Sequence, residues 1–368
     1  METRTDADFM RVALNLAARA MGNTSPNPAV GAVIVRNGRI VGQGYHRRAG
    51  LPHAEVEALR QAGTRARGST MYVTLEPCDH VGRTPPCCDA VETAGVKRVV
   101  AAMKDPNPIT NGRGMAHLRR AGIAVTTGVL EAEAKRLNVP FIKAMTAHLP
   151  WVTAKVAQSL DGKIATATGA SRWISSPASR RFAHELRRGA DSILVGVKTL
   201  IADDPSLTVR GVKRSSRPHR PLKVIVDSRL RTPLSSRCLS PGTIIATTVQ
   251  SAAKHAPYRR KGIELIVLPP LRGYVPLKRL MRELWRRHQV QSVLIEGGGE
   301  VLASALQERI VDRLVWMIAP LLIGGRTSPS SVGGSGIRRL NEAIRLKGLT
   351  IRRLGPDMIV EADVAYPT

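Results

Sequence analysis

The chain has 368 residues, of which 43% are hydrophobic, with four cysteines and a formal net charge of +28. This length and composition favour two folded domains and exclude both a largely disordered chain and a scaffold built from disulfides. The N-terminus lacks the basic-then-apolar order of a signal peptide, and the longest nearly uncharged apolar stretch, residues 314–325, is about half as long as a membrane span. We therefore expect a cytoplasmic protein that does not enter a membrane.

The positive charge arises from 56 Lys and Arg against 28 Asp and Glu. Such a field favours anionic partners, either a small phosphorylated substrate or nucleic acid. Aromatic residues make up only 3% of the chain, which leaves few platforms for stacking bases. We favour the small substrate over nucleic acid, although a solvated basic surface without a functional role explains the charge equally well.

The first part of the chain alternates between helical and strand patterns. Two strand-like runs, residues 30–35 and 40–45, flank Asn37-Gly38, a strong signal for a β-hairpin. The remaining pattern predicts helices at residues 8–21, 53–62, 87–94 and 115–121, and strands at residues 71–75, 96–103 and 123–128. This alternation predicts a sheet with helices packed on it, in an α/β domain of residues 1–146.

A linker is expected at residues 145–150, because Pro150 interrupts the pattern and a new strand follows at once. The second domain, residues 147–368, again alternates between strands and helices. Strands are predicted at residues 151–157, 192–197, 222–227, 243–247, 263–268, 292–295, 311–319, 349–354 and 358–362, and helices at 179–188, 277–288 and 301–307. Because the last strands follow one another without helices, we expect a mixed sheet.

The sharpest chemical signal is His53 and Glu55 followed by Cys78 and Cys87. One imidazole and two thiolates are three ligands for one tetrahedral Zn²⁺ per chain, with the fourth position open to water, as in catalytic zinc sites. Bound water then has a pKa near 7, and Glu55 is suited to carry protons from it to a leaving amine. Both Cys87, after two prolines, and His53 are expected at helix starts, where the helix dipole lowers a thiol pKa.

Eight residues separate Cys78 from Cys87, whereas two separate the cysteines of the general cytidine-deaminase signature. This insert carries polar groups that could bind a substrate beside the metal. Cys88 is interpreted as a neighbour of the site, and Cys238 as an ordinary core or surface residue. In the second domain, Gly297-Gly298-Gly299 between a strand and a helix could admit a phosphate, but a plain tight turn explains it equally well.

The sequence resembles the bifunctional riboflavin-biosynthesis deaminase/reductase family over nearly its whole length. In the first domain the resemblance is carried by Pro26-Asn27-Pro28-Ala29-Val30-Gly31, Gly44-Tyr45-His46, Pro52-His53-Ala54-Glu55, Thr74-Leu75-Glu76-Pro77-Cys78, Gly82-Arg83-Thr84-Pro85-Pro86-Cys87 and Asp105-Pro106-Asn107-Pro108. It implies a three-layer α/β/α cytidine-deaminase-like domain, zinc at His53, Cys78 and Cys87, and Glu55 as the proton carrier. It further implies substrate contacts from Asn27, His46, His80, Arg83, Asp105 and Asn107.

In the second domain the resemblance runs through residues 155–163, 171–174 and 202–210 and the Gly triplet. It implies a dihydrofolate-reductase-like fold that binds NADPH. The residues implied at the NADPH site are Ala157, Trp173, Thr199, Asp203, Ser228, Gly298, Gly299, Glu300, Val301, Leu302, Ala303 and Ser304. Those implied to hold the substrate are Ser171, Arg187, Leu207, Arg210 and Glu296. Arginine pairs bidentately with phosphate oxygens, which suits Arg187 and Arg210 to a ribose phosphate.

The resemblance implies hydrolytic deamination of 2,5-diamino-6-ribosylamino-4(3H)-pyrimidinone 5′-phosphate, then NADPH-dependent reduction of the ribosyl side chain, in a homo-oligomer (a dimer or a tetramer). Two alternatives stay open at this point. A nucleic-acid deaminase would share the zinc and the glutamate, but not the long cysteine gap or the second domain. A binding protein with a structural zinc would explain the charge, but would give Glu55 no task.

Overall fold

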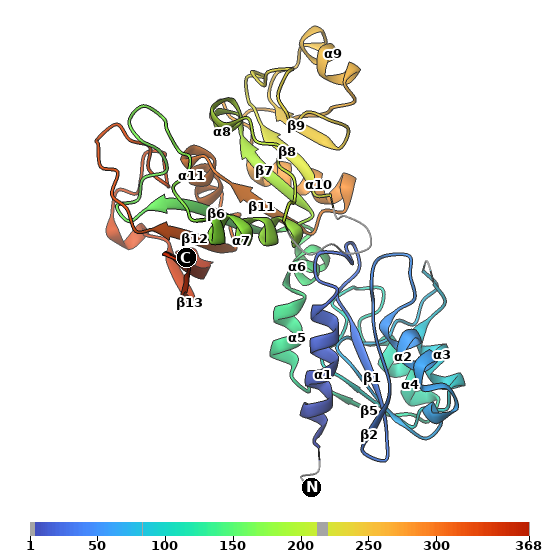
Figure 1. Ribbon diagram of the computed structural model, residues 1–368. Coiled ribbons are helices and arrows are strands. Elements are labelled where there is room, and N and C mark those ends of the chain that lie inside the picture. Colours follow the sequence, from blue (N-terminus) through green and yellow to red (C-terminus); the bar gives the residue numbers. More distant parts are fainter. Residues whose placement is uncertain (1–3, 83, 212–219, 368) are drawn as a thin grey trace. The chain divides into compact units, whose positions relative to one another are not determined.

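The computed structural model describes residues 4–82, 84–211 and 220–367, which fold into two compact units, Met1–Leu149 and Pro150–Thr368 (Figure 1). Helix α6 (Val139–Ala147) closes unit 1, and strand β6 (Trp151–Ser159) opens unit 2. The division expected after residue 146 would cut α6, and the expected linker is therefore partly helical. Pro150 is the first residue of unit 2 and directly precedes β6.

Unit 1 contains a five-stranded sheet in the order β2-β1-β3-β4-β5. Strand β1 is antiparallel to β2 and β3, whereas β3, β4 and β5 are mutually parallel. The bounds are β1 Gly31–Arg36, β2 Arg39–Tyr45, β3 Thr70–Val73, β4 Arg98–Ala101 and β5 Ala124–Thr127. Asn37 and Gly38, with φ of 51° and 71°, form the predicted two-residue turn between β1 and β2.

Helices cover both faces of this sheet, as the three-layer prediction requires. Helix α1 lies on one face and α2, α3 and α4 on the other, and α5 packs beside α1 (Figure 1). Their bounds are α1 Asp6–Ala18, α2 Ala54–Ala62, α3 Cys87–Thr93, α4 Arg113–Arg120 and α5 Glu131–Leu137, with a short 3-10 helix at Gly63–Ala66. The core between the layers contains Met10, Ile34, Met71 and Leu118, all fully buried.

Two glycines of β2 fix the position of α2. A Cβ atom on Gly42 would lie 2.2 Å from the carbonyl oxygen of Ala58, and one on Gly44 would lie 2.6 Å from that of Ala54. No side chain fits in that space, so the helix backbone rests directly on the strand. The N-terminus of α2, which begins beside His53, is thereby held at a fixed height above the sheet.

Unit 2 contains a nine-stranded mixed sheet in the order β10-β9-β8-β7-β11-β6-β12-β14-β13. The seven strands from β10 to β12 are parallel, and the β13–β14 hairpin joins β12 in antiparallel fashion. The bounds not yet given are β7 Ser192–Gly196, β8 Leu222–Val226, β9 Thr243–Thr247, β10 Glu264–Val267, β11 Ser292–Glu296, β12 Arg313–Ala319, β13 Arg345–Leu354 and β14 Asp357–Ala365. The predicted mixed sheet is confirmed.

The helices of unit 2 are α7 Pro177–Arg188, α8 Val197–Asp203, α9 Ala252–Arg260, α10 Leu277–His288 and α11 Gly299–Gln307, with a 3-10 helix at Leu340–Glu342. The sequence pattern missed α8 and α9, and also α5 and α6 of unit 1. Helix α8 starts at the residue after β7, which leaves no loop to mark the change. Helix α9 has Pro257 inside it, and proline interrupts a helical pattern.

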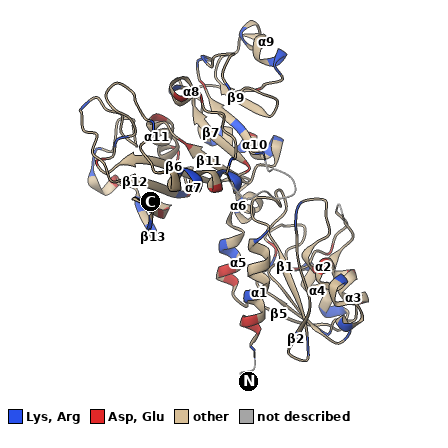
Figure 2. Ribbon diagram, in the orientation of Figure 1, with Lys and Arg blue, Asp and Glu red and all other residues tan. Residues whose placement is uncertain are grey.

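Within the described part of the chain, no helix is long and apolar enough to cross a membrane. Lys and Arg occur on elements of both units, including α9 and β13, rather than on one strip (Figure 2). The high net charge therefore does not by itself mark a binding surface.

Candidate metal centre and cofactor cavity

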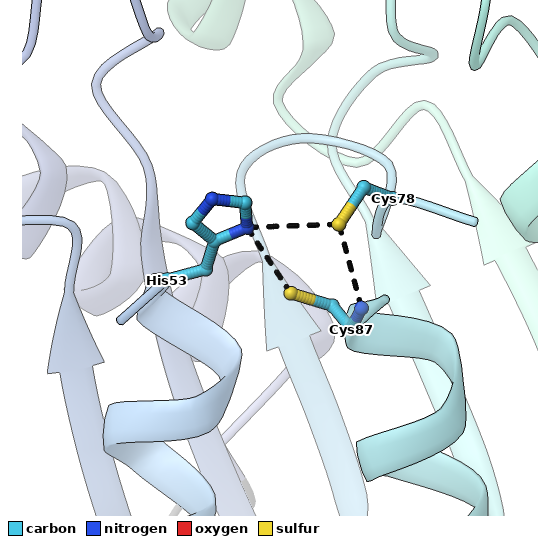
Figure 3. Close-up of side chains that lie close together, drawn as sticks. All are labelled: His53, Cys78 and Cys87. Atoms are coloured by element: carbon cyan, nitrogen blue, oxygen red, sulfur yellow. Dashed lines mark hydrogen bonds between the residues drawn. The ribbon is translucent and has the colours of Figure 1, made fainter. Parts of the chain in front are cut away.

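Three side chains of unit 1 converge as the sequence predicts (Figure 3). His53 is the N-cap of α2, and Cys87 is the first residue of α3. The Nδ1 atom of His53 lies 3.2 Å from Sγ of Cys87 and 3.6 Å from Sγ of Cys78. The backbone N–H of Cys87 donates to Sγ of Cys78 at 3.4 Å. Two helix starts and one loop thus bring the three donors together.

This donor set fits a tetrahedral metal ion. The three ligand atoms all lie within 4.8 Å of one another. A tetrahedral ion with bonds of about 2.0 Å to nitrogen and 2.3 Å to sulfur would separate the two kinds of donor by about 3.5 Å. The nitrogen–sulfur distances here bracket that separation. One nitrogen and two sulfurs suit zinc and leave one coordination position for water.

The thiol of Cys87 donates its proton to the sulfur of Cys78 in a hydrogen bond. A hydrogen bond from Cys87 and another from His53 lower the pKa of Cys78 to about 4. The hydrogen bond to Cys78 and burial raise the pKa of Cys87, so the expectation that the helix dipole would lower it is wrong for the metal-free chain. A cation at this position would take the place of that proton.

Glu55 lies in the first turn of α2 and is only 3% exposed. Burial, followed by the negative charge of Cys78, raises the pKa of Glu55 to about 7, while the charge of His53 opposes this and Cys87 donates a hydrogen bond to it. Its Oε2 atom is buried and has no hydrogen-bond partner among the described residues. The carboxylate therefore lies beside the donors with one oxygen unoccupied, as a proton carrier requires.

Asn27 and His46 form a polar pair beside the metal donors. Burial lowers the pKa of His46, which favours the neutral ring. Its Nδ1–H donates to the carbonyl of Pro52 at 3.2 Å, so its Nε2 accepts from the amide of Asn27 at 3.1 Å. The ring of His46 meets the ring of His53 edge-on at 5.2 Å between centroids. The amide oxygen of Asn27 is thereby oriented by its neighbours.

The other residues implied to contact the substrate form a second group. His80 Nδ1 lies 3.4 Å from the hydroxyl of Thr110, and Asp105 accepts the N–H of Asn107 at 2.9 Å. Burial raises the pKa of Asp105 to about 6, and the nearby His80 opposes this rise. Asn107 accepts the N–H of Ile109 at 3.1 Å, as in a local turn. Arg83 lies outside the described residues.

No role was predicted for Glu76 or Thr84, although both lie close to the metal donors. The carboxylate of Glu76 is buried and accepts the N–H groups of Asp105, Gly112 and Met115 at 2.9 to 3.1 Å. It caps α4 and fixes the loop that carries Cys78. The hydroxyl of Thr84 lies 3.5 Å from Nε2 of His53, on the ring edge that faces away from the sulfurs. Both residues occur in motifs that carry the family resemblance, and this is the one feature of the sequence that could have indicated them.

Unit 2 contains a cavity of about 1390 Å³ at the carboxyl ends of its parallel strands β6, β7, β8 and β11. Open α/β sheets bind ligands at this edge. Every residue of unit 2 that the resemblance implied for NADPH or substrate lines this one cavity, although these residues run from Ala157 to Ser304 in the sequence. The structure thus brings the whole implied set together.

A buried ion pair lies in this cavity. The guanidinium of Arg187 donates to both carboxylate oxygens of Glu296 at 2.8 and 2.6 Å, and to the carbonyl of Thr208 at 3.0 Å. These bonds occupy the guanidinium of Arg187. Arg210 is exposed, and its guanidinium donates to the hydroxyls of Ser206 and Thr208.

Lys155 also lines the cavity, although no role was predicted for it. It lies in the middle of β6, and burial lowers its pKa, an effect that Glu296 opposes and Arg187 reinforces. A lysine with a lowered pKa releases its proton more readily than an exposed one. The ammonium of Lys155 is therefore suited to donate a proton in the cavity.

The glycine run forms one wall of the cavity. Gly297 and Gly298 have φ of 74° and 86°, which side chains rarely adopt. A Cβ atom on Gly299 would lie 2.6 Å from the carbonyl oxygen of Ser330. The glycines therefore make a tight turn, and they also leave the N-terminus of α11 open to the cavity.

Across the cavity, Ser171 donates to the carboxylate of Asp203 at 3.0 Å, and Arg172 donates to the carbonyl of the same residue. Trp173 is 68% exposed and stacks against Arg180, whose guanidinium lies 4.5 Å from the ring centroid. An aromatic plate at the mouth of a cavity offers a surface for a flat ring.

Fold and sites together define a two-part enzyme class, a cytidine-deaminase-like unit followed by a dihydrofolate-reductase-like unit. Residues 3–103 match the cytidine and deoxycytidylate deaminase zinc-binding region, and residues 150–360 match the RibD C-terminal domain. The riboflavin biosynthesis protein RibD of Aquifex aeolicus is 45% identical over 357 residues, 96% of this chain and 97% of that protein. The chain belongs to the RibD family of riboflavin biosynthesis proteins.

Solved structures agree with this family. Acinetobacter baumannii RibD, form 1, is 38% identical, with a TM-score of 0.91 and coverage of 99% of this chain and 100% of that one. A Thermotoga maritima protein named as a diaminohydroxyphosphoribosylaminopyrimidine deaminase/5-amino-6-(5-phosphoribosylamino)uracil reductase is 33% identical, with a TM-score of 0.84 and coverage of 98% and 99%. The similarity extends over both units.

Proposed function

We propose that this chain catalyses two successive steps of riboflavin biosynthesis. Unit 1 hydrolyses the ring amine of 2,5-diamino-6-ribosylamino-4(3H)-pyrimidinone 5′-phosphate, and unit 2 reduces the ribosyl side chain of the product to a ribityl chain with NADPH. The observation that carries the proposal is the buried Glu55, one oxygen of which lacks a partner among the described residues, beside one imidazole and two sulfurs.

In unit 1, zinc would be held by His53, Cys78 and Cys87, and would supply a water of lowered pKa. Glu55 would carry two protons in succession, one to the ring nitrogen as the water oxygen adds to the ring and one from the added hydroxyl to the amine, which leaves as ammonia. Its pKa of about 7 suits a group that must both accept and release a proton near neutrality. The oriented amide of Asn27 and the carboxyl of Asp105 are proposed to position the pyrimidine and its ribose.

In unit 2, NADPH would supply the hydride, and the residues of the chain bind and orient both reactants. The cofactor would be held by the wall from Gly298 to Ser304, by Ser228 and by Trp173. Arg210 is proposed to anchor the ribose phosphate, and Lys155 to donate the proton that accompanies the hydride. Glu296, fixed by Arg187, is proposed to hold the ribose hydroxyls.

The experiment follows ammonia release and NADPH oxidation in the same reaction with the diaminopyrimidine substrate. We expect one ammonia per NADPH oxidised, and the loss of both signals after a chelator has removed the metal. NADPH oxidation should return when the deaminated pyrimidine is added to the metal-free protein. NADPH oxidation by metal-free protein with the diaminopyrimidine would contradict the proposed order of the two steps.

We also propose that the chain works in the cytoplasm as a homo-oligomer, a dimer or a tetramer. A reducing compartment suits three clustered thiols that form no disulfide among the described residues. Strand β13 is the edge of the unit 2 sheet, and its Leu349 and Ile351 are 52% and 60% exposed, which a second copy would bury. Light scattering after size-exclusion chromatography tests the assembly, and a monomer would contradict it.

A further inference from the structure

His117 on α4 connects the two segments that carry the sulfur donors. Its Nδ1 lies 2.5 Å from the carboxylate of Asp79, the residue after Cys78. Its Nε2 lies 3.2 Å from the carboxylate of Glu92 on α3, the helix that begins with Cys87. Asp89, also on α3, lies 3.9 Å from the same Nε2. One imidazole therefore bridges the Cys78 loop and the Cys87 helix.

The bridge is strongest when the ring is protonated, because only the imidazolium donates from both nitrogens. Hydrogen bonds to Glu92 and Asp79 raise the pKa of His117 above its ordinary value. The side chains of His117 and Asp79 are 23% and 22% exposed, so solvent screens this pair only in part. Charge-assisted hydrogen bonds of this kind are stronger than neutral ones.

The first half of α4 packs on the same loop, residue by residue. Glu76 caps the helix through the N–H groups of Gly112 and Met115. A Cβ atom on Gly114 would lie 1.9 Å from the carbonyl oxygen of Pro77, so helix and loop backbones are in direct contact. His117 follows one turn later with its bond to Asp79. Helix α4 thus contacts the loop at Glu76, Pro77 and Asp79, on both sides of Cys78.

We propose that His117 is a positioning residue for the metal centre and holds Cys78 and Cys87 at ligand spacing from outside the site. This inference rests on the proposed deaminase function. It adds to that function the contacts of His117 with Asp79 and Glu92, which the family resemblance does not imply. Partners of this kind behind metal ligands typically change metal affinity or activity by about 10- to 100-fold when removed.

A second metal ion is the alternative reading of this cluster, because Asp79, Cys88 and His117 place one ligand atom each within 4.8 Å of the others. The contacts favour the bridge. Nδ1 of His117 and Oδ1 of Asp79 are separated by 2.5 Å, which accommodates a shared proton, whereas two ligands of one ion lie about 3 Å apart or more. The thiol of Cys88 is fully buried and faces the carbonyls of Pro77 and Gly114.

The test measures the rate at which zinc passes from the zinc-loaded full chain to a chromogenic chelator. We expect His117→Ala to release zinc about 10-fold faster or more, and His117→Gln, which can reach only one carboxylate, to fall between it and wild type. Arg120→Ala, an exposed change on the same helix, is the matched control and should release zinc at the wild-type rate. Circular dichroism reports that unit 1 of each variant has folded, and reductase activity on the deaminated pyrimidine reports the same for unit 2.

Cobalt provides a readout that a merely structural role would not change. The visible spectrum of Co²⁺-substituted protein reports the ligand geometry, and we expect weaker tetrahedral bands in His117→Ala. We also expect the deaminase kcat to fall while KM for the pyrimidine is nearly unchanged. If His117→Ala is obtained only as aggregate, Glu92→Gln replaces it, with an expected acceleration of about twofold or more.

Wild-type protein that binds zinc and deaminates normally, while its His117→Ala variant releases zinc at the wild-type rate, would overturn the positioning role alone. Two zinc ions per wild-type chain, falling to one in His117→Ala, would overturn it in favour of a second metal site. Wild-type protein that binds no metal would overturn the proposed function, and the positioning role with it.

Discussion

Each unit buries a glutamate at its site, and the two carboxylates have opposite surroundings. Glu55 of unit 1 has one oxygen without a partner among the described residues, and burial raises its pKa to about 7. Burial acts on Glu296 of unit 2 in the same direction, but the charge of Arg187 and its two hydrogen bonds outweigh it and lower the pKa. A carboxylate that moves protons needs a pKa near the working pH, whereas one that holds a ligand needs a fixed charge.

The two sites also differ in how the chain builds them. The metal centre uses four side chains between residues 53 and 87, of which His53, Glu55 and Cys87 lie at helix starts and Cys78 lies in a loop. The cofactor cavity draws its lining from residues 154 to 335, gathered where parallel strands end. Short sequence motifs can therefore predict the metal centre, whereas the cofactor cavity depends on the order of the strands in the sheet.

The largest expected effect separates the two glutamates by function. Glu55→Gln preserves the shape but cannot accept a proton, so we expect deamination to fall by about 10²- to 10⁴-fold. Reduction of the deaminated pyrimidine by the same protein should be unchanged, and this activity serves as the internal control. The measurement is ammonia release under saturating substrate. Deamination within a factor of two of wild type would remove Glu55 from the mechanism.

The second-largest effect is on stability, and it is expected when a substitution breaks the ion pair of unit 2. Arg187→Met leaves the carboxylate of Glu296 buried without its partner, which costs about 3 to 5 kcal/mol of unfolding free energy. The matched control is Arg237→Met, because Arg237 and Asp204 form an exposed pair whose loss should cost about 1 kcal/mol or less. Urea unfolding, followed by circular dichroism, measures both. Equal costs for the two variants would refute the distinction.

The third effect concerns the glycine wall, which belongs to unit 2 alone. Gly299→Ala places a methyl group 2.6 Å from the carbonyl oxygen of Ser330, and such overpacking costs about 1 to 3 kcal/mol. KM for NADPH should rise as the wall moves. Gly189→Ala is the control, because its new methyl group would meet its nearest neighbour at 3.6 Å, an ordinary contact. An unchanged KM in Gly299→Ala would place the cofactor elsewhere.

The smallest expected effect concerns a third buried carboxylate, that of Asp105. Burial raises the pKa of Asp105 to about 6, above its value in the unfolded chain. The folded state therefore binds a proton more tightly than the unfolded state, and its stability falls as the pH rises through about 6. Asp105→Asn should remove this loss and stabilise the protein by about 1 to 2 kcal/mol at pH 8, with no gain at pH 4. A gain of equal size at both pH values would contradict this origin.

The sequence allowed prediction of the metal donors and Glu55 because few arrangements other than a metal site place those residue types in three short motifs. It also predicted the mixed sheet of unit 2 from the run of strands at its end. The pairing of Arg187 with Glu296 could not be predicted, because 109 residues separate them and only the folded cavity brings them together. His117 gave no signal of its own, since its partners lie on a loop and a helix distant in the chain.

The central claim is a metal ion held by one imidazole nitrogen and two sulfurs, with the fourth position open. X-ray absorption at the zinc edge of the loaded protein tests it most directly. We predict two sulfur neighbours at about 2.3 Å and two nitrogen or oxygen neighbours at about 2.0 Å, with the sulfur count halved in Cys78→Ser. Four sulfur neighbours, or a spectrum that Cys78→Ser leaves unchanged, would contradict the account.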